Sequence, residues 1–97
     1  MSYVILWSYE VAPEHERAFI AAYGPEGDWA RLFATAAGFL GVDLYRDGAR
    51  FLTIDRWQSE AAFQAFQAAR GAEYQALDAR CDALTLAETR LGAFVTA

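Results

Sequence analysis

The segment from residue 50 to residue 66 constrains the fold of this chain more than any other stretch. Arg50–Trp57 is rich in β-branched and aromatic side chains and is typical of a strand. Ser59 follows as a helix N-cap, and Phe63 begins the apolar stripe of a helix. Because the strand ends in a large aromatic next to the start of a packed helix, the segment predicts a small apolar pocket walled by Trp57.

The rest of the chain completes a split order of strands and helices. A turn at Asp47-Gly48 joins two strands into a hairpin, which is the strongest local signal in the sequence. The expected elements are a strand over Tyr3–Val11, a helix from Pro13 to about Tyr23, a short helix from the N-cap Asp28 to Gly38, strands over Phe39–Arg46 and Arg50–Trp57, a helical segment from Ser59 that Gly71 breaks or bends into two helices, and a strand within Leu84–Val95 that is irregular near Gly92. Strand–helix–strand twice over predicts an α+β, ferredoxin-like βαββαβ domain with an antiparallel sheet, spanning residues 1–97.

The chain carries more apolar surface than one such subunit can bury. Its 97 residues are 56% hydrophobic and 15% aromatic, above the usual apolar share of about half. Alternation along the two middle strands gives an aliphatic set (Leu40, Val42, Leu44, Leu52, Ile54) and a mixed aromatic and polar set (Phe39, Gly41, Asp43, Tyr45, Phe51, Thr53, Asp55, Trp57). Helices on one side leave the other face open, yet both sets are bulky, so we expect two sheets to pack together in a homodimer. Alternation leaves open which face meets the helices.

Charge and composition argue against several kinds of partner and cofactor. The net charge is −5, and the eight basic residues are single, scattered arginines, so we expect neither nucleic-acid nor membrane-surface binding. With one cysteine, no leader pattern and no apolar run of membrane length, we expect a soluble cytoplasmic protein without a disulfide framework. No residues have metal-ligand spacing and no glycines form a nucleotide signature, so we expect neither a metal nor a nucleotide cofactor.

Three short motifs resemble the antibiotic biosynthesis monooxygenase-like family. They are Gly27-Asp28-Trp29, Gly38-Phe39-Leu40-Gly41, and Ile54-Asp55-Arg56-Trp57 followed by Ser59 and Phe63, within a likeness that runs from about Val4 to Phe94. The resemblance implies a ferredoxin-like subunit whose sheet pairs with a second copy into a dimeric α/β barrel, with a pocket between sheet and helices. Some members oxygenate aromatic polyketides without metal or flavin, others degrade haem, and others process small signalling molecules. The haem-degrading pattern needs an Asn near the position of Trp7 and a His after the tryptophan of the third strand, and no His follows His15 here.

Aromatic side chains are the candidates for the walls of a substrate pocket. Trp57 would stack on a planar substrate and donate from its indole N–H, or else it is a structural residue that closes the barrel end. The other expected substrate-binding residues are Trp7, Tyr9, Trp29 and Phe63. Each would line the pocket, and the plainer interpretation of each is an ordinary core position.

Polar strand and helix residues are the candidates for catalysis. Asp55 shares the alternation of Trp57, so in an apolar site its raised pKa would suit a general base. Tyr45 and Tyr74 would hold a substrate carbonyl or oxyanion by their hydroxyls, unless they are core residues. The plainer interpretation of the charged strand residues is an ion pair, within the sheet or across the dimer. The residues concerned are Asp43, Asp55 and Arg56. Among the remaining residues with reactive side chains, we expect His15 on the surface and Cys81 in the core.

Three functional hypotheses remain open from the sequence. The first is a cofactor-independent monooxygenase acting on an aromatic or quinol-type small molecule. The second is a non-catalytic homodimer that binds a small apolar ligand. The third is a protein in which every aromatic serves stability and no cavity exists. Turnover separates the first two, and a cavity separates both from the third.

Overall fold

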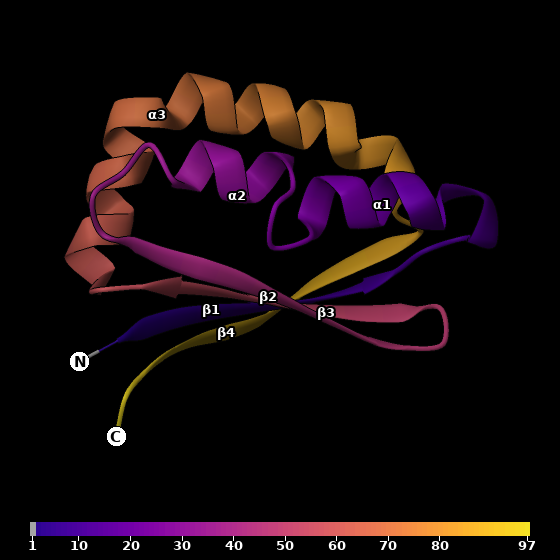
Figure 1. Ribbon diagram of the computed structural model, residues 1–97, viewed down its shortest axis with the longest axis horizontal. Helices are drawn as coiled ribbons and strands as arrows, with labels where there is room; N and C mark the ends of the chain where they lie inside the picture. The colour runs from indigo at the N-terminus through magenta and orange to yellow at the C-terminus, as the bar shows by residue number, and fades with distance from the viewer. Residues whose placement is uncertain (1) are drawn as a thin grey trace.

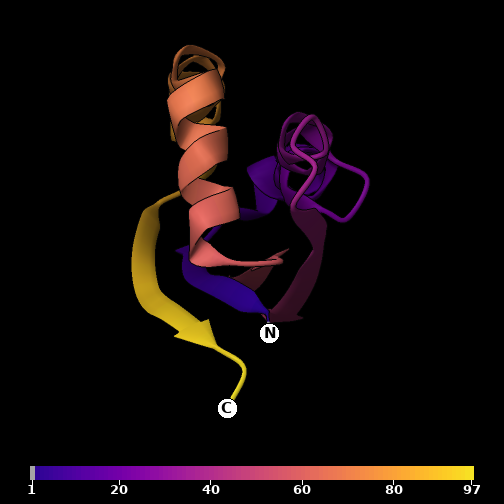
Figure 2. The same cartoon turned by 90° about the vertical axis from the view of Figure 1, so that its left-hand side faces the viewer.

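The computed structural model describes residues 2–97 as a four-stranded antiparallel sheet covered on one face by helices (Figure 1). The strand order β2-β3-β1-β4 is that of the ferredoxin-like fold, as the sequence predicts. The elements are β1 (Tyr3–Glu10), η1 (Pro13–His15), α1 (Glu16–Tyr23), α2 (Asp28–Phe33), β2 (Phe39–Asp47), β3 (Arg50–Trp57), α3 (Glu60–Cys81), η2 (Asp82–Leu84) and β4 (Ala87–Val95). Turning the molecule by 90° shows α3 beside the α1–α2 layer, all on the same side of the sheet (Figure 2).

Of the two N-cap residues that the sequence predicts, Ser59 is an N-cap in the structure and Asp28 is not. Ser59 is the N-cap of α3, and its hydroxyl accepts a hydrogen bond of 3.1 Å from the Ala62 N–H, as predicted. Asp28, predicted as the N-cap of α2, lies inside the helix instead. Gly27 is the N-cap, because its carbonyl accepts the first helical bond from the Arg31 N–H at 3.0 Å. Asp28 forms a salt bridge with Arg31 one turn later.

A bend divides α3 into two parts, close to the predicted position. Arg70 has non-helical dihedral angles (φ −126°, ψ 24°) immediately before Gly71. Phe66 is buried before the bend, and Leu77 and Cys81 are buried after it. The two parts of α3 therefore cover different regions of the sheet.

Pairing between the strands decides which side chains face the helices, the point that alternation left open. On β1 and β3 the buried positions, such as Ile5 and Thr53, lie on the helix side. On β2 the register shifts between Phe39 and Gly41, where Gly41 adopts φ 148°, a region that favours glycine. After this bulge Val42 lies opposite Asp55 and faces the helices, so the aliphatic sets of β2 and β3 occupy opposite faces.

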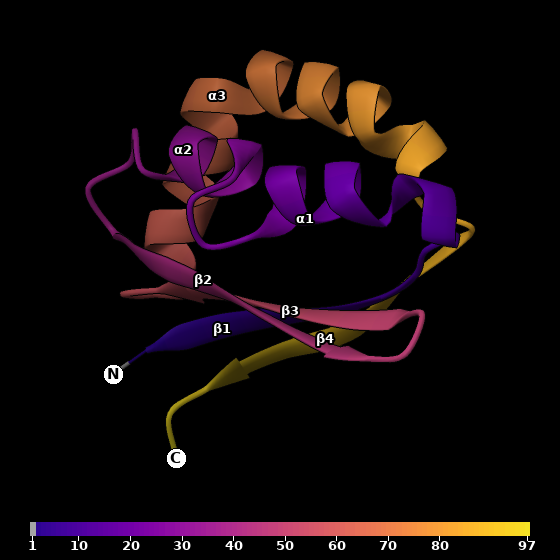
Figure 3. The ribbon, with the colours of Figure 1, turned by 45° about the vertical axis from the view of Figure 1, so that its right-hand side comes forward.

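The outer face of the sheet remains open in the described chain. All helices lie on the other side, as a view turned by 45° also shows (Figure 3). Apolar side chains on the outer face include Val4, Leu6, Leu52 and Ile54, which are half-buried, and Phe94, which is 54% exposed. The excess apolar surface inferred from composition is thus concentrated on one face.

Candidate functional site

The region around Trp57 is solid core and not a pocket. Trp57 is completely buried, and its indole lies 5.3 Å from the rings of Phe39, Phe63 and Phe66 between ring centroids. Phe33 adds a fourth ring at 5.4 Å. Neither Trp57 nor Phe63 lines the cavity described next. Of the two interpretations of Trp57, a wall that stacks on substrate or a structural residue, the structure favours the second. Aromatic rings from α2, β2 and α3 fill the space above it.

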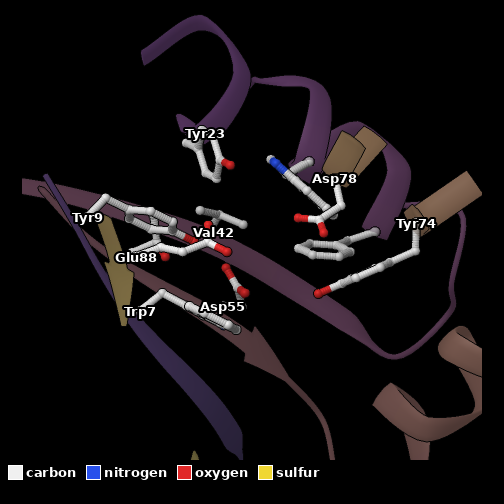
Figure 4. Close-up of a pocket in the computed structure, with 11 residues that line it drawn as sticks. Trp7, Tyr9, Tyr23, Val42, Asp55, Tyr74, Asp78 and Glu88 are labelled. Atoms are coloured by element: carbon white, nitrogen blue, oxygen red, sulfur yellow. The ribbon is translucent and has the colours of Figure 1, made fainter. Parts of the chain in front are cut away.

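A cavity of about 110 Å³ opens farther along the same layer, between sheet and helices (Figure 4). Its volume is somewhat below the roughly 150 Å³ of an enclosed apolar cavity that binds benzene. Side chains from all four strands and all three α-helices contribute to its wall. They are Trp7, Tyr9, Tyr23, Trp29, Phe33, Val42, Thr53, Asp55, Tyr74, Asp78 and Glu88.

Among the described residues, Asp55 is the one carboxyl group that the two central strands, β1 and β3, direct toward this cavity. It lies on β3 between Ile5 of β1 and Val42 of β2, and its carboxyl group points into the space (Figure 4). No arginine pairs with it in residues 2–97, and burial raises its pKa from 3.8 to about 7. Of the acidic residues for which the sequence allowed an ion pair, it is Asp43 that forms one, with Arg56 at 2.9 Å.

Three tyrosines line the same cavity as protonated hydrogen-bond donors. Burial raises the pKa of Tyr9, Tyr23 and Tyr74 above the usual value. For Tyr74, negative charge on Asp78 and Asp55 raises the pKa further. Its hydroxyl enters the cavity from the side opposite Tyr9 (Figure 4). At neutral pH these hydroxyls can donate to a substrate oxygen.

Two tryptophans supply flat walls, and one of them has an unused donor. Trp7 lies on the floor of the site and stacks on Tyr9, with ring centroids 6.3 Å apart and planes inclined by 20°. Trp29 packs edge-on against Tyr74 at 5.0 Å. Its buried Nε1–H makes no hydrogen bond within the described chain, and the same is true of the indole N–H of Trp57 in the solid core. The Tyr23 hydroxyl and the Cys81 thiol lie close enough to Trp29 for it to influence the pKa of both groups. Trp57 shows that an unpartnered indole N–H does not by itself mark a ligand site, but the N–H of Trp29 belongs to a side chain that lines the cavity, where a ligand oxygen would supply the acceptor.

A family model for antibiotic biosynthesis monooxygenases matches residues 2–78. The chain belongs to this family. The solved structures agree in fold. SnoaB from Streptomyces nogalater, a cofactor-independent oxygenase, has a TM-score of 0.73 at 21% identity, over 99% of this chain and 93% of SnoaB. A Bordetella bronchiseptica protein provisionally assigned to antibiotic biosynthesis monooxygenases has a TM-score of 0.76 at 19% identity, over 99% and 97% of the two chains. Rv0793 from Mycobacterium tuberculosis has a TM-score of 0.69 at 19% identity, over 100% and 99%. No protein of curated function matches the chain in sequence.

Within this family fold, the sequence-predicted site residues divide into two groups. Five of them meet at the cavity: Trp7, Tyr9, Trp29, Asp55 and Tyr74. Trp57 and Phe63 belong to the core cluster described above. Tyr45, proposed as a catalytic hydroxyl, is 57% exposed on the outer face, because its register partner Leu52 points away from the helices.

Sequence reasoning missed two carboxylates of this family member's cavity. Asp78 lies one helical turn after Tyr74 on α3, a spacing that was visible in the sequence. Glu88 lies opposite Tyr9 on β4, and only the bulge in that strand pair brings it there. Burial and the nearby Asp78 raise the pKa of Glu88.

Three further observations concern metal ligands, membrane-spanning helices and the cysteine. No group of three His, Cys, Asp or Glu side chains in residues 2–97 could hold a metal ion. None of the helices in that range combines the length and the apolar character needed to cross a bilayer. Cys81 is buried on α3, as expected, and burial raises the pKa of its thiol.

Proposed function

We propose that this chain is a small monooxygenase that oxidises an electron-rich phenol or quinol without metal or flavin. Its membership in the monooxygenase family supports the reaction class, and the cofactor-independent oxygenase SnoaB shares its fold. The observation that carries the proposal is Asp55, an unpaired carboxyl in an aromatic-walled cavity with a pKa of about 7. A group with that pKa accepts a proton at neutral pH and also gives one back.

In the proposed reaction Asp55 removes the proton of the ring hydroxyl. The phenolate passes one electron to dioxygen, and the resulting radical pair forms a carbon–oxygen bond as a peroxide. Asp55 returns its proton to the peroxide and then takes the proton from the oxygenated ring carbon as the oxygen–oxygen bond breaks. One oxygen stays in the product as a carbonyl, and the other leaves as hydroxide, which receives this second proton and becomes water. The substrate loses two hydrogens and gains one oxygen, so it supplies all the electrons that dioxygen needs.

The other cavity residues have supporting roles in this proposal. The Tyr74 hydroxyl donates to the oxyanion that forms on the substrate. Trp7 and Trp29 bound the ring and exclude water, which favours charge transfer in a dry site. The volume of about 110 Å³ favours a one-ring substrate over a fused aromatic.

Oxygen consumption by metal-free protein tests the proposal. The substrate panel runs from one-ring hydroquinones to anthrone, with the uncatalysed rate measured beside each. We expect uptake above that rate for at least one single-ring quinol, with one oxygen atom from labelled dioxygen in the product. Uptake at the background rate across the panel, while ligands still bind, would favour the alternative of a non-catalytic binding protein.

We propose further that the chain is a homodimer joined through the outer face of its sheet. The support is the apolar set on that face, which includes Leu6, Ile54 and the half-exposed Phe94. Sedimentation at micromolar concentration should give twice the chain mass. Phe94→Asp should yield a monomer, whereas Ile20→Asp, at a 41% exposed position on α1, should leave the dimer intact. A monomeric wild-type chain would contradict this proposal.

A further inference from the structure

All the charged side chains among the described residues that line the cavity are carboxylates. Asp55, Asp78 and Glu88 come from β3, α3 and β4, three elements far apart in the sequence. Figure 4 shows their carboxyl groups directed toward a common space. No arginine or histidine is among the described lining residues, and the sequence has no lysine. Such a cavity disfavours an anionic ligand and attracts a cation.

The three carboxyls differ in depth. Asp55 is half-buried at the sheet, whereas Asp78 and Glu88 are exposed residues at the mouth. All three lie near enough to Tyr74 to raise the pKa of its hydroxyl. The mouth can therefore hold a charged group while Asp55 remains free for the ring.

The aromatic walls also suit a cation. Tyr74 and Trp7 present rings beside the carboxyls, and a protonated amine over an aromatic face gains cation–π attraction that strengthens as water is removed. Trp29 also lines the cavity with a side chain that is only 7% exposed, and its Nε1–H makes no hydrogen bond within the described chain. A ring oxygen of a ligand would provide an acceptor.

We propose that the cavity selects a one-ring phenol or quinol that carries a protonated amine. The amine lies at the mouth between Asp78 and Glu88, and the ring lies between the tryptophans with its oxygens toward Asp55 and the Trp29 N–H. This inference rests on the proposed function, since it names the substrate class of the same site.

One basic residue, Arg90, lies close enough to Tyr74 to lower the pKa of its hydroxyl. Arg90 lies opposite Trp7 on β4, but it is exposed and does not line the cavity. A metal ion is a poorer occupant of the same charges, because the described residues form no metal-binding group.

A matched set of three phenols tests the inference without turnover. Tyramine, para-propylphenol and para-hydroxyphenylacetate share a phenol ring and a side chain of three atoms in line, and they differ in charge. Calorimetric titration at pH 8 and low salt should show tyramine binding at least tenfold more tightly than propylphenol, and the carboxylate binding most weakly. The tyramine preference should shrink as salt is added, because the mouth is solvent-exposed.

A double variant checks that the mouth carboxylates cause the preference. Asp78→Asn with Glu88→Gln should weaken tyramine about tenfold and leave propylphenol within twofold, and circular dichroism checks that it is folded. Asp47→Asn, at the hairpin end, is the control and should change neither affinity.

The contrary results are distinct from failure of the oxygenase proposal. Equal binding of tyramine and propylphenol, tighter binding of the carboxylate, or no binding of any of the three would overturn the inference. Tyramine-selective binding without oxygen uptake from any quinol would remove the oxygenase chemistry and keep the ligand preference. Oxygen uptake with no preference for amines would keep the oxygenase chemistry and remove the ligand preference.

Discussion

Trp57 and Asp55 lie two residues apart on β3 and face the same helix layer, yet one is in solid core and the other opens onto a cavity. Above Trp57, aromatic rings from three elements fill the space. Above Asp55, the layer is hollow. The bend of α3 at Arg70 lies between Phe66, which covers the solid region, and Tyr74, which lines the hollow one. A strand decides which face a side chain joins, but other elements decide whether that face is packed.

The largest expected effect separates the two regions by stability. Trp57→Ala removes a completely buried side chain and should lower the free energy of unfolding by about 3–5 kcal/mol. Trp7→Ala, at a half-buried cavity wall, should cost no more than about 2 kcal/mol and abolish ligand binding. Urea unfolding with tryptophan fluorescence measures both. Equal losses of stability would erase the distinction between core and cavity.

The next expected effect concerns catalysis. Asp55→Asn keeps the shape of the side chain and removes the proposed base, so the rate of quinol oxidation should fall about a hundredfold or more. Asp47→Asn is the matched control and should retain the wild-type rate. An Asp55→Asn variant with normal oxygen uptake would show that this carboxyl is not the base.

The sequence predicted the framework because period-two strands, the Asp47-Gly48 turn and the Ser59 cap are local signals. It also predicted Asp55 and Tyr74, which carry polar groups on apolar stripes. It misjudged the position of the pocket, because the filling of the space over Trp57 by Phe33 and Phe39 depends on contacts between distant elements. The irregularity predicted near Gly92 is present, because Gly92 adopts φ 145° where the register between β1 and β4 shifts. Glu88 was missed because the glycine indicates an irregularity but not how far the register shifts.

The raised pKa of Asp55 should make the free energy of unfolding depend on pH. Its pKa is about 7 in the folded protein and near 3.8 in the unfolded chain, so the folded state binds more protons between those values. The stability that Asp55 contributes below about pH 4 is therefore lost as pH rises toward 7, by roughly 1 kcal/mol per pH unit at the steepest. Asp55→Asn should match wild type at pH 4 and be more stable at pH 8. Parallel stability curves for the two proteins, measured by urea unfolding, would contradict a raised pKa.

The smallest expected effect concerns the bend between the two regions. A Cβ at Gly71 would meet no atom within 4 Å, so Gly71→Ala should stabilise the protein by about 0.5–1 kcal/mol through helix propensity. The bend should persist, because Arg70 carries the non-helical angles, and ligand affinity should stay unchanged. A stabilised variant that no longer binds ligand would mean that the glycine maintains the cavity.

The location of a bound ring tests the central claim most directly. A crystal structure of the protein with tyramine is expected to show the ring inside the cavity, between Trp7 and Trp29, with its hydroxyl within hydrogen-bond distance of Asp55. A ring bound on the outer sheet face, or one that enters by opening the cluster around Trp57, would contradict the account.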